Sequence, residues 1–200
     1  MAPTDVVVVT GFGPFSSFEE NPSSQVVDEL AKTKIPGFDG QLVVEKMSVA
    51  YSEVEEKVKS LWTRYSPKLV VHIGAHPIHH HIKLEQQSFG RGYCKYDVDG
   101  CVPQNNMCPT NSEPILSTKI NCEEIASKVS QELGYKGLKI TASDDPGRYL
   151  CAYSFYLSLS HDASRSLFIH VPPFDSTCTL EMVTAVVQKT ITTILSTLDS

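Results

Sequence analysis

Short apolar runs alternate along the chain with longer amphipathic stretches. Five of these runs have the length and composition of buried strands: residues 6–10, 41–48, 68–73, 138–142 and 166–171. Helical spacing of apolar residues predicts helices over 51–65, 121–133 and 178–198, and further helices after Asn21 and after Cys151. Strands that alternate with helices are typical of the α/β class, whose ligand sites lie at the carboxyl ends of the strands.

Residues 75–114 show neither the apolar runs of strands nor the apolar spacing of helices clearly. Four histidines, at positions 76, 79, 80 and 81, lead into a segment rich in Gly, Asn, Asp and Cys. We predict a long ordered loop or an irregular hairpin here, and such loops are often functional. The chain has no repeat and no linker-like tract, so we expect one domain over residues 1–200.

Composition narrows the class of protein. The 41% hydrophobic and 20% charged content is that of a globular protein. The net charge is −6 and the basic residues are dispersed, so we expect no nucleic-acid partner and no membrane partner. Six cysteines without a recognisable secretory signal are expected to be reduced, which predicts a cytoplasmic protein.

Cys151 follows a polar turn, Asp-Asp-Pro-Gly at 144–147, at the point where a helix should begin. Unpaired N–H groups and the helix dipole at such a position favour the thiolate, which is the nucleophilic form. The same N–H groups can bind a developing oxyanion. The alternative is a buried, inert thiol, which is the commoner fate of a free cysteine.

His170 is the candidate base for this nucleophile. It stands near the end of the strand that follows Cys151, and we expect that strand to end at the same sheet edge as the strand before the turn. A histidine paired inside the core is an equally good interpretation of its position. Glu85, at the end of a strand-like stretch, is a weaker candidate to orient the imidazole, because surface carboxylates are common.

The histidine run is the strongest metal-like signal, but three consecutive histidines cannot all face one point in a regular element. Cysteines 94, 101 and 108 are seven apart, unlike a zinc ribbon. We therefore predict no metal site and interpret the run as a solvated polar loop. The chain contains neither a P-loop nor a dinucleotide-binding glycine motif, and no cofactor is expected.

Four separated motifs resemble the pyroglutamyl-peptidase I family of cytosolic cysteine peptidases, most closely its animal members. They are TGFGPF at 10–15 with NPSS at 21–24, LEQQ around Glu85, DPGRYLCAYSFY around Cys151, and FIHVPP around His170. The resemblance covers nearly the whole chain. It implies a three-layer α/β/α sandwich with a mixed, largely parallel central sheet.

The resemblance also implies a role for each matching residue. Cys151 would be the nucleophile, His170 the base and acid, and Glu85 the group that orients His170. Phe12 and Phe15 would line a pocket for the uncharged lactam of small pyroglutamyl peptides, with a loop plug as the alternative role. Tyr149 and Leu150 are candidates for a further wall of that pocket. The oligomeric state is left open, with a monomer favoured.

Two positions depart from the family pattern. Gln86 stands where a basic residue is usual, and Gly90 where the family has Asn. These changes leave a weakened or inactive relative that binds pyroglutamyl peptides as an alternative to the peptidase. A metal-binding or redox-sensing module built on the histidines and extra cysteines is a further alternative.

Overall fold

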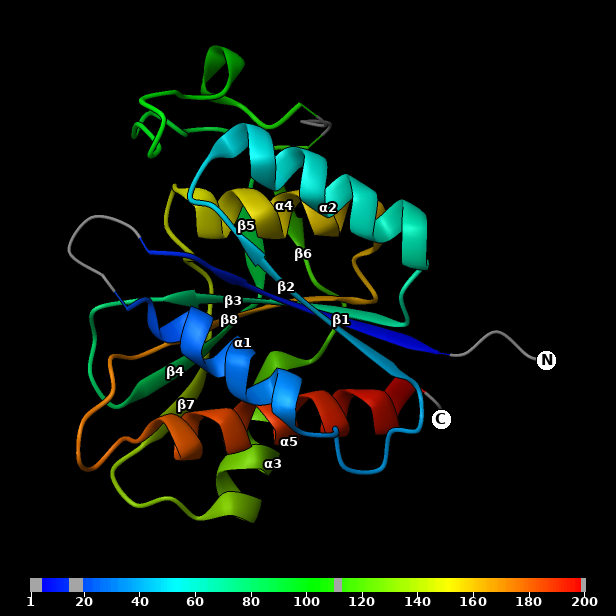
Figure 1. The fold of residues 1–200 in the computed structure, drawn as a ribbon, viewed down its shortest axis with the longest axis vertical. Helices are drawn as coiled ribbons and strands as arrows, with labels where there is room; N and C mark the ends of the chain where they lie inside the picture. Colours follow the sequence, from blue (N-terminus) through cyan, green and yellow to red (C-terminus); the bar gives the residue numbers. More distant parts are fainter. Residues whose placement is uncertain (1–4, 15–19, 110–112, 199–200) are drawn as a thin grey trace.

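A six-stranded sheet forms the centre of the protein in the computed structural model, which describes residues 5–14, 20–109 and 113–198 (Figure 1). The strand order is β2-β1-β3-β8-β4-β7. The strands are β1 (Val6–Phe12), β2 (Gln41–Met47), β3 (Leu69–Ala75), β4 (His81–Glu85), β7 (Lys139–Ser143) and β8 (Ser166–Val171). Each of the five predicted strands is confirmed, and β1 extends two residues beyond the predicted end because Gly11 and Phe12 pair with β2.

The sheet is mixed, as expected. Neighbouring strands run parallel except at the β4–β8 pair, where they are antiparallel. Because β7 runs parallel to β4, it runs opposite to β8. The prediction that the strands before and after Cys151 end at the same edge is therefore wrong. The stretch that ends at Glu85 was recognised as strand-like, but its place between β8 and β7, which causes this reversal, was not predicted.

Helices cover both faces of the sheet. On one face lie α2 (Tyr51–Tyr65) and α4 (Leu150–Asp162), and on the other lie α1 (Pro22–Lys32), α3 (Cys122–Leu133) and α5 (Leu180–Leu198) (Figure 1). The predicted three-layer α/β/α sandwich is confirmed. Helix α1 begins directly after Asn21, as predicted, and ends at Lys32, because Thr33 adopts an extended conformation.

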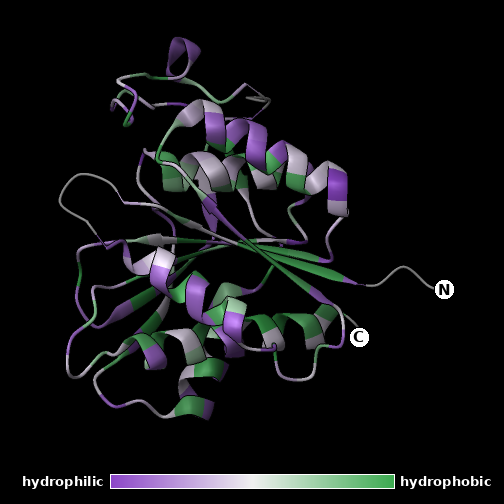
Figure 2. Cartoon of the chain, viewed as in Figure 1, coloured by the Kyte–Doolittle hydropathy of each residue, from purple (hydrophilic) through white to green (hydrophobic). Residues whose placement is uncertain are grey.

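Alternation along the strands creates two separate cores. In β8, Leu167, Ile169 and Val171 face one core, and Phe168 faces the other. This two-residue period is what a sheet covered on both faces requires. Figure 2 shows the consequence: hydrophobic residues concentrate in the central strands, and α2 carries hydrophilic residues on its outer side.

The segment between β3 and α3 contains more regular structure than predicted. Residues 81–85 form the interior strand β4, since Ile82 and Leu84 alternate into the core. The short strands β5 (Gln87–Phe89) and β6 (Ile115–Ser117) pair antiparallel, and between them lies one 3₁₀ turn (Gln104–Asn106). The Gly-, Asn-, Asp- and Cys-rich part, for which a long ordered loop or an irregular hairpin was expected, connects this antiparallel pair. In Figure 1 its loop lies beside the start of α2.

Candidate functional site

Cys151 lies in the first turn of α4 and is half-buried. The helix begins at Leu150, and the first bond that closes its turn joins the Tyr153 N–H to the Tyr149 carbonyl. Earlier N–H groups of a helix have no intrahelical partner. The side chain of Tyr149, the N-cap residue, does not cap these N–H groups in the described structure. Cys151 therefore belongs to a turn whose N–H groups can donate hydrogen bonds to an anion.

His170 and Glu85 form a buried pair on the same face of the sheet. His170 Nδ1 lies 2.7 Å from Glu85 Oε1, and the Glu85 side chain is fully buried. The other carboxylate oxygen, Oε2, is buried without a hydrogen-bond partner among the described residues. An unpaired buried carboxylate oxygen costs stability, and such costs are typical of functional sites. The pair fixes the imidazole so that Nε2 remains for another partner.

That other partner is Cys151. Burial by itself lowers the pKa of His170, but the Cys151 side chain, through its charge and a hydrogen bond, and the Glu85 carboxylate outweigh burial and raise that pKa to about 9. A protonated imidazole is thus stabilised between a sulfur and a carboxylate. Cysteine nucleophiles with a histidine base use this arrangement. The structure brings together the three residues singled out from the sequence.

Gly74, which the sequence analysis did not single out, leaves the space that the sulfur occupies. It pairs with His170 in the register of β3 and β8. A Cβ atom at this position would lie 2.6 Å from Cys151 Sγ and 2.7 Å from Phe168 Cζ. Such distances are far inside van der Waals contact. Only glycine here lets α4 approach the sheet closely enough for Cys151 to reach His170.

A small hollow opens beside the sulfur. Its lining comes from the carboxyl ends of β1, β2 and β3 and from the starts of α1 and α4: Phe12, Asn21, Val49, Ala75, Tyr149, Leu150 and Cys151. Phe12, Tyr149 and Leu150 are thus where the sequence placed a pocket, whereas Phe15 lies outside the described residues. Asn21, Val49 and Ala75 were missed. Val49 and Ala75 stand just after predicted strands, and that position was the signal that could have found them. Asn21 stands at the start of α1 and was named only as a cap of that helix.

Asn21 holds the backbone at the end of β1, beside this hollow. Its Oδ1 accepts hydrogen bonds from the Ser23 N–H and hydroxyl, at 3.0 and 2.9 Å, and its Nδ2 donates to the Gly13 carbonyl at 3.0 Å. The Ser23 hydroxyl in turn accepts from the Phe12 N–H at 3.0 Å. The Asn that was predicted to cap α1 therefore also fixes the backbone beside Phe12.

The two glutamines after Glu85 hold the turn before the nucleophile. Gln86 Nε2 donates to the Asp144 carboxylate, and Gln87 Nε2 to the Asp144 carbonyl, each at 3.0 Å. The backbone of Gly90 is also paired, because its N–H donates to Pro114 and its carbonyl accepts from Cys108. Both positions that depart from the family pattern thus have structural partners in this chain.

The loop at 93–109 supports the wall of the hollow from outside. The Tyr149 hydroxyl donates to the Tyr96 carbonyl at 3.0 Å, and Tyr51 packs edge-on against Tyr149 with ring centroids 6.0 Å apart. The buried Asp97 accepts from the Tyr51 N–H at 2.9 Å. This loop therefore holds Tyr149 in place through a second aromatic ring.

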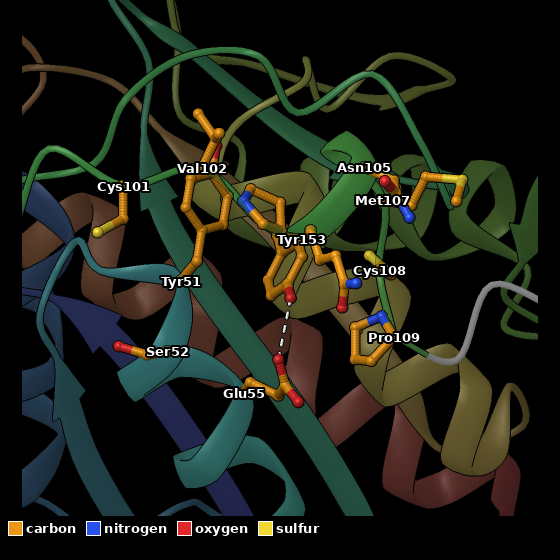
Figure 3. A pocket seen from close by; sticks show the side chains of 12 residues that line it. Tyr51, Ser52, Glu55, Cys101, Val102, Asn105, Met107, Cys108, Pro109 and Tyr153 are labelled. Carbon is orange, nitrogen blue, oxygen red and sulfur yellow. Dashed lines mark hydrogen bonds between the residues drawn. The ribbon is translucent and has the colours of Figure 1, made fainter.

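A larger pocket of about 470 Å³ lies under the same loop, between α2 and α4 (Figure 3). Tyr51, Tyr153 and Glu55 point into it, and the Tyr153 hydroxyl donates to Glu55 Oε2 at 3.2 Å. Cys151 does not line this pocket. Size alone therefore does not identify the candidate site, because Cys151 lines the smaller hollow and not this pocket.

The remaining cysteines and histidines divide by burial. All six cysteines are free, and burial raises the pKa of the Cys108 and Cys122 thiols to about 12, which makes them poor nucleophiles. His76 packs edge-on against His170, with ring centroids 5.8 Å apart, and its Nε2 bonds to the His81 carbonyl at 2.6 Å.

In residues 5–14, 20–109 and 113–198, no helix is both long enough and apolar enough to cross a membrane.

Comparison with known proteins agrees with this geometry. The family model described as "Putative pyroglutamyl peptidase PgaPase_1" matches residues 2–175. Pyroglutamyl-peptidase 1 of Homo sapiens is 35% identical over 171 residues, which cover 86% of this chain and 80% of the relative. Pyrrolidone-carboxylate peptidase of Pyrococcus furiosus is 29% identical over 174 residues, covering 83% and 80%.

The fold comparison reaches the same group of proteins. The structure of pyrrolidone carboxyl peptidase from Thermococcus litoralis superposes with a TM-score of 0.83 at 19% identity, and the match covers 98% of this chain and 95% of the other. At that identity the likeness concerns the fold. The sequence matches extend over most of the chain and carry the assignment: this chain belongs to the pyroglutamyl-peptidase family.

Proposed function

We propose that this protein is a cysteine exopeptidase that removes an N-terminal pyroglutamate from small peptides. The observation that carries the proposal is the convergence of Cys151, His170 and Glu85 beside a small hollow in a chain of this family. Relatives named pyroglutamyl-peptidase 1 and pyrrolidone-carboxylate peptidase support the substrate class.

The lactam ring of the substrate binds in the hollow. Phe12, Val49 and Leu150 offer apolar surface to a flat, uncharged ring, and Tyr149 adds an aromatic wall. The lining of the hollow, among the residues that the structure describes, contains no acidic side chain, which suits a substrate residue that lacks a charged α-amine. A ring seated there presents its exocyclic carbonyl to Cys151 Sγ.

Catalysis then proceeds by acyl transfer. His170 takes the thiol proton, the sulfur attacks the pyroglutamyl carbonyl carbon, and the oxyanion is stabilised by N–H groups in the first turn of α4. The C–N bond breaks as His170 returns the proton to the leaving amine. Water, deprotonated by His170, hydrolyses the thioester and releases pyroglutamate. Glu85 keeps the imidazole oriented and stabilises its charged form. No step requires a metal or cofactor.

The proposal includes the cytoplasm as the location, because a catalytic thiol must stay reduced. It also includes a monomer, since the three residues and the hollow all come from one chain. Sedimentation of the purified protein tests that state.

The test is release of a fluorogenic amine from its pyroglutamyl conjugate under reducing conditions. We expect release by the wild type and a loss of at least about 10⁴-fold in kcat/KM for Cys151→Ala. Circular dichroism of the variant checks its fold. Equal release by both proteins would refute Cys151 as the nucleophile. Binding of a pyroglutamyl ligand without release by the wild type would establish the inactive relative instead.

A further inference from the structure

The proposed reaction does not use the four histidines at positions 76–81, and two of them converge with a residue from a distant part of the chain. His79 and His80 lie on the turn between β3 and β4, and Asp175 lies in the connection between β8 and α5. One side-chain ligand atom from each of the three lies within 4.8 Å of the other two. Asp175 Oδ2 is 2.6 Å from His80 Nε2 and 3.6 Å from His79 Nδ1.

The Asp175 carboxylate is oriented so that one oxygen is held and the other is presented. Oδ1 accepts three hydrogen bonds, each at 2.8 Å, from the Thr177 N–H, the Thr177 hydroxyl and the Cys178 N–H. Oδ2 faces the two imidazoles. Partners that fix a ligating carboxylate in this way are the outer contacts that metal sites commonly have.

The backbone conformation of His80 restricts where its imidazole can lie. Its φ is 55°, in the left-handed region that few non-glycine residues adopt. The Thr177 hydroxyl lies 3.1 Å from His80 Nε2, so two atoms of the aspartate turn, this hydroxyl and Asp175 Oδ2, contact the same ring nitrogen. His79 and His80 lie in a turn, outside helix and strand, and His80 has a left-handed backbone. The two consecutive side chains can therefore converge on one point.

We propose that His79, His80 and Asp175 form a binding site for a transition-metal cation of the Zn²⁺ type, with water in the fourth position. Two imidazole nitrogens and one carboxylate oxygen suit Zn²⁺ and its neighbours better than Mg²⁺ or Ca²⁺, which prefer oxygen ligands. Ligand atoms of a tetrahedral Zn²⁺ site lie about 3.3 Å from one another. The His79 and Asp175 atoms, 3.6 Å apart, are already near that spacing, whereas the His80 and Asp175 atoms must separate from their hydrogen-bond distance of 2.6 Å. This site is separate from the peptidase machinery and does not depend on the proposed reaction.

The position of the site gives the cation a mechanical consequence. The turn that carries His79 and His80 begins at His76, whose ring packs against His170. The connection that carries Asp175 begins directly after Val171, the residue that follows His170. A bound cation therefore ties together the two segments that lead away from the catalytic histidine. Binding to the folded state alone also raises the melting temperature.

The test is calorimetric titration of Zn²⁺ into full-length, tag-free protein in which Cys151→Ala removes the reactive thiol. We expect one equivalent per chain and a Zn²⁺-dependent rise in melting temperature. In the same background, His80→Asn and Asp175→Asn should each weaken binding at least about tenfold. Asn tolerates the left-handed backbone at 80, and at 175 its amide oxygen can still accept from Thr177 and Cys178.

His81→Gln is the matched control. The third histidine of the run points elsewhere, with its Nε2 2.7 Å from the Thr141 hydroxyl, so its loss should leave Zn²⁺ affinity unchanged. Co²⁺ bound in place of Zn²⁺ should show no thiolate charge-transfer band. The proposal is overturned by absence of binding, by unchanged affinity in the Asp175→Asn protein, by an equal loss in His81→Gln, or by a thiolate band, which would move the ion to a cysteine.

Discussion

The two faces of the sheet are built from different residues. Under α1, α3 and α5 the fully buried cluster consists of Val, Leu, Ile, Ala and Cys side chains. Under α2 and α4 the buried cluster is rich in aromatic rings: Phe12, Tyr51, Trp62, Tyr93, Tyr153, Phe155, Tyr156 and Phe168. The proposed catalytic residues all belong to the aromatic side.

The two faces also differ in their buried polar groups, although each face contains at least one without a partner among the described residues, Glu85 Oε2 on the aromatic face included. On the aromatic face, His72 is 2.6 Å from the Thr10 hydroxyl and 2.7 Å from the Ser158 hydroxyl, which also accepts from Trp62 Nε1 at 3.0 Å. Burial lowers the pKa of His72 to about 3, so this ring is neutral. On the aliphatic face, two buried hydroxyls of α5, those of Thr184 and Thr190, lack a hydrogen-bond partner in the described structure.

This difference teaches what each face does. Aliphatic side chains fill space without specifying direction, and their packing stabilises the sheet. Rings with polar ends and hydrogen-bonded histidines fix orientations, which a reactive site needs. Mutations on the aliphatic face should therefore change stability alone, and mutations on the aromatic face should change catalysis as well.

The largest expected effect after loss of the nucleophile is that of Glu85→Gln. The amide can still accept from His170 but cannot stabilise its positive charge. We expect kcat/KM to fall about 10²- to 10⁴-fold. Because Glu85 helps raise the pKa of His170 to about 9, the basic limb of the pH profile should move to lower pH in the variant. Initial rates of the fluorogenic reaction across pH measure both effects.

Stability provides a second readout of the same pair. A histidine whose folded pKa is raised contributes stability that is complete below its unfolded pKa of about 6.5 and is lost as pH rises through about 9. The wild type should lose at most about 3 kcal/mol over that window, and Glu85→Gln less. Glu55→Gln, a carboxylate on α2 away from Cys151, is the control. A Glu85→Gln enzyme within threefold of wild-type activity would refute the orienting role.

Gly74→Ala should have the next largest effect. The added methyl overlaps Cys151 Sγ and Phe168, so α4 or the ring must move. We expect a fall of about 10- to 100-fold in kcat/KM and a stability cost of about 1–3 kcal/mol, measured by urea unfolding.

Gly11→Ala is the matched comparison for this change. Its Cβ would lie 2.8 Å from Val27 on the aliphatic face and 2.8 Å from the Ser23 carbonyl. We expect a similar stability cost with a smaller loss of activity. Equal losses of activity in the Gly11 and Gly74 variants would show that general strain, and not the position of the sulfur, explains the effect.

Substitutions at two adjacent residues of β8, one on each face, test the difference between the faces most directly. Phe168→Leu and Ile169→Val should each cost about 1 kcal/mol of unfolding free energy. The Phe168 ring lies 4.8 Å from the His170 ring, so only the first change should also lower kcat, by several-fold. If Ile169→Val lowers kcat as much as Phe168→Leu does, the division between the faces does not hold.

The smallest effect is expected for Gln86→Ala. It removes one exposed hydrogen bond to Asp144, and Gln87 still holds the same turn. We expect less than about 1 kcal/mol in stability and a fall in kcat/KM of less than threefold. Gln188→Ala, which removes an exposed bond of the same type to Thr33 on the other face, should leave activity unchanged. A large loss in Gln86→Ala would mean that the departure from the family pattern does affect catalysis.

Local patterns were enough to predict most of the fold. The apolar runs and helical spacings predicted five of the six central strands and the five α-helices of the described residues. The reason is that the buried positions of a strand or helix repeat with the period of that element. β4 was not recognised as an interior strand, since its five residues alternate with His and Lys and follow a histidine run. Its antiparallel placement next to β8 depends on contacts with residues 85 positions away.

The sequence by itself determined the candidate chemistry: a cysteine at a helix start, a histidine ending a strand, and motifs that place Glu85 with them. Only the tertiary structure decided that Gly74 leaves room for the sulfur, that Asn21, Val49 and Ala75 complete the hollow, and that Asp175 meets His79 and His80. The physical reason is that these relations join residues distant in the chain. Strand order, register and close approach set such distances, and no local period encodes them.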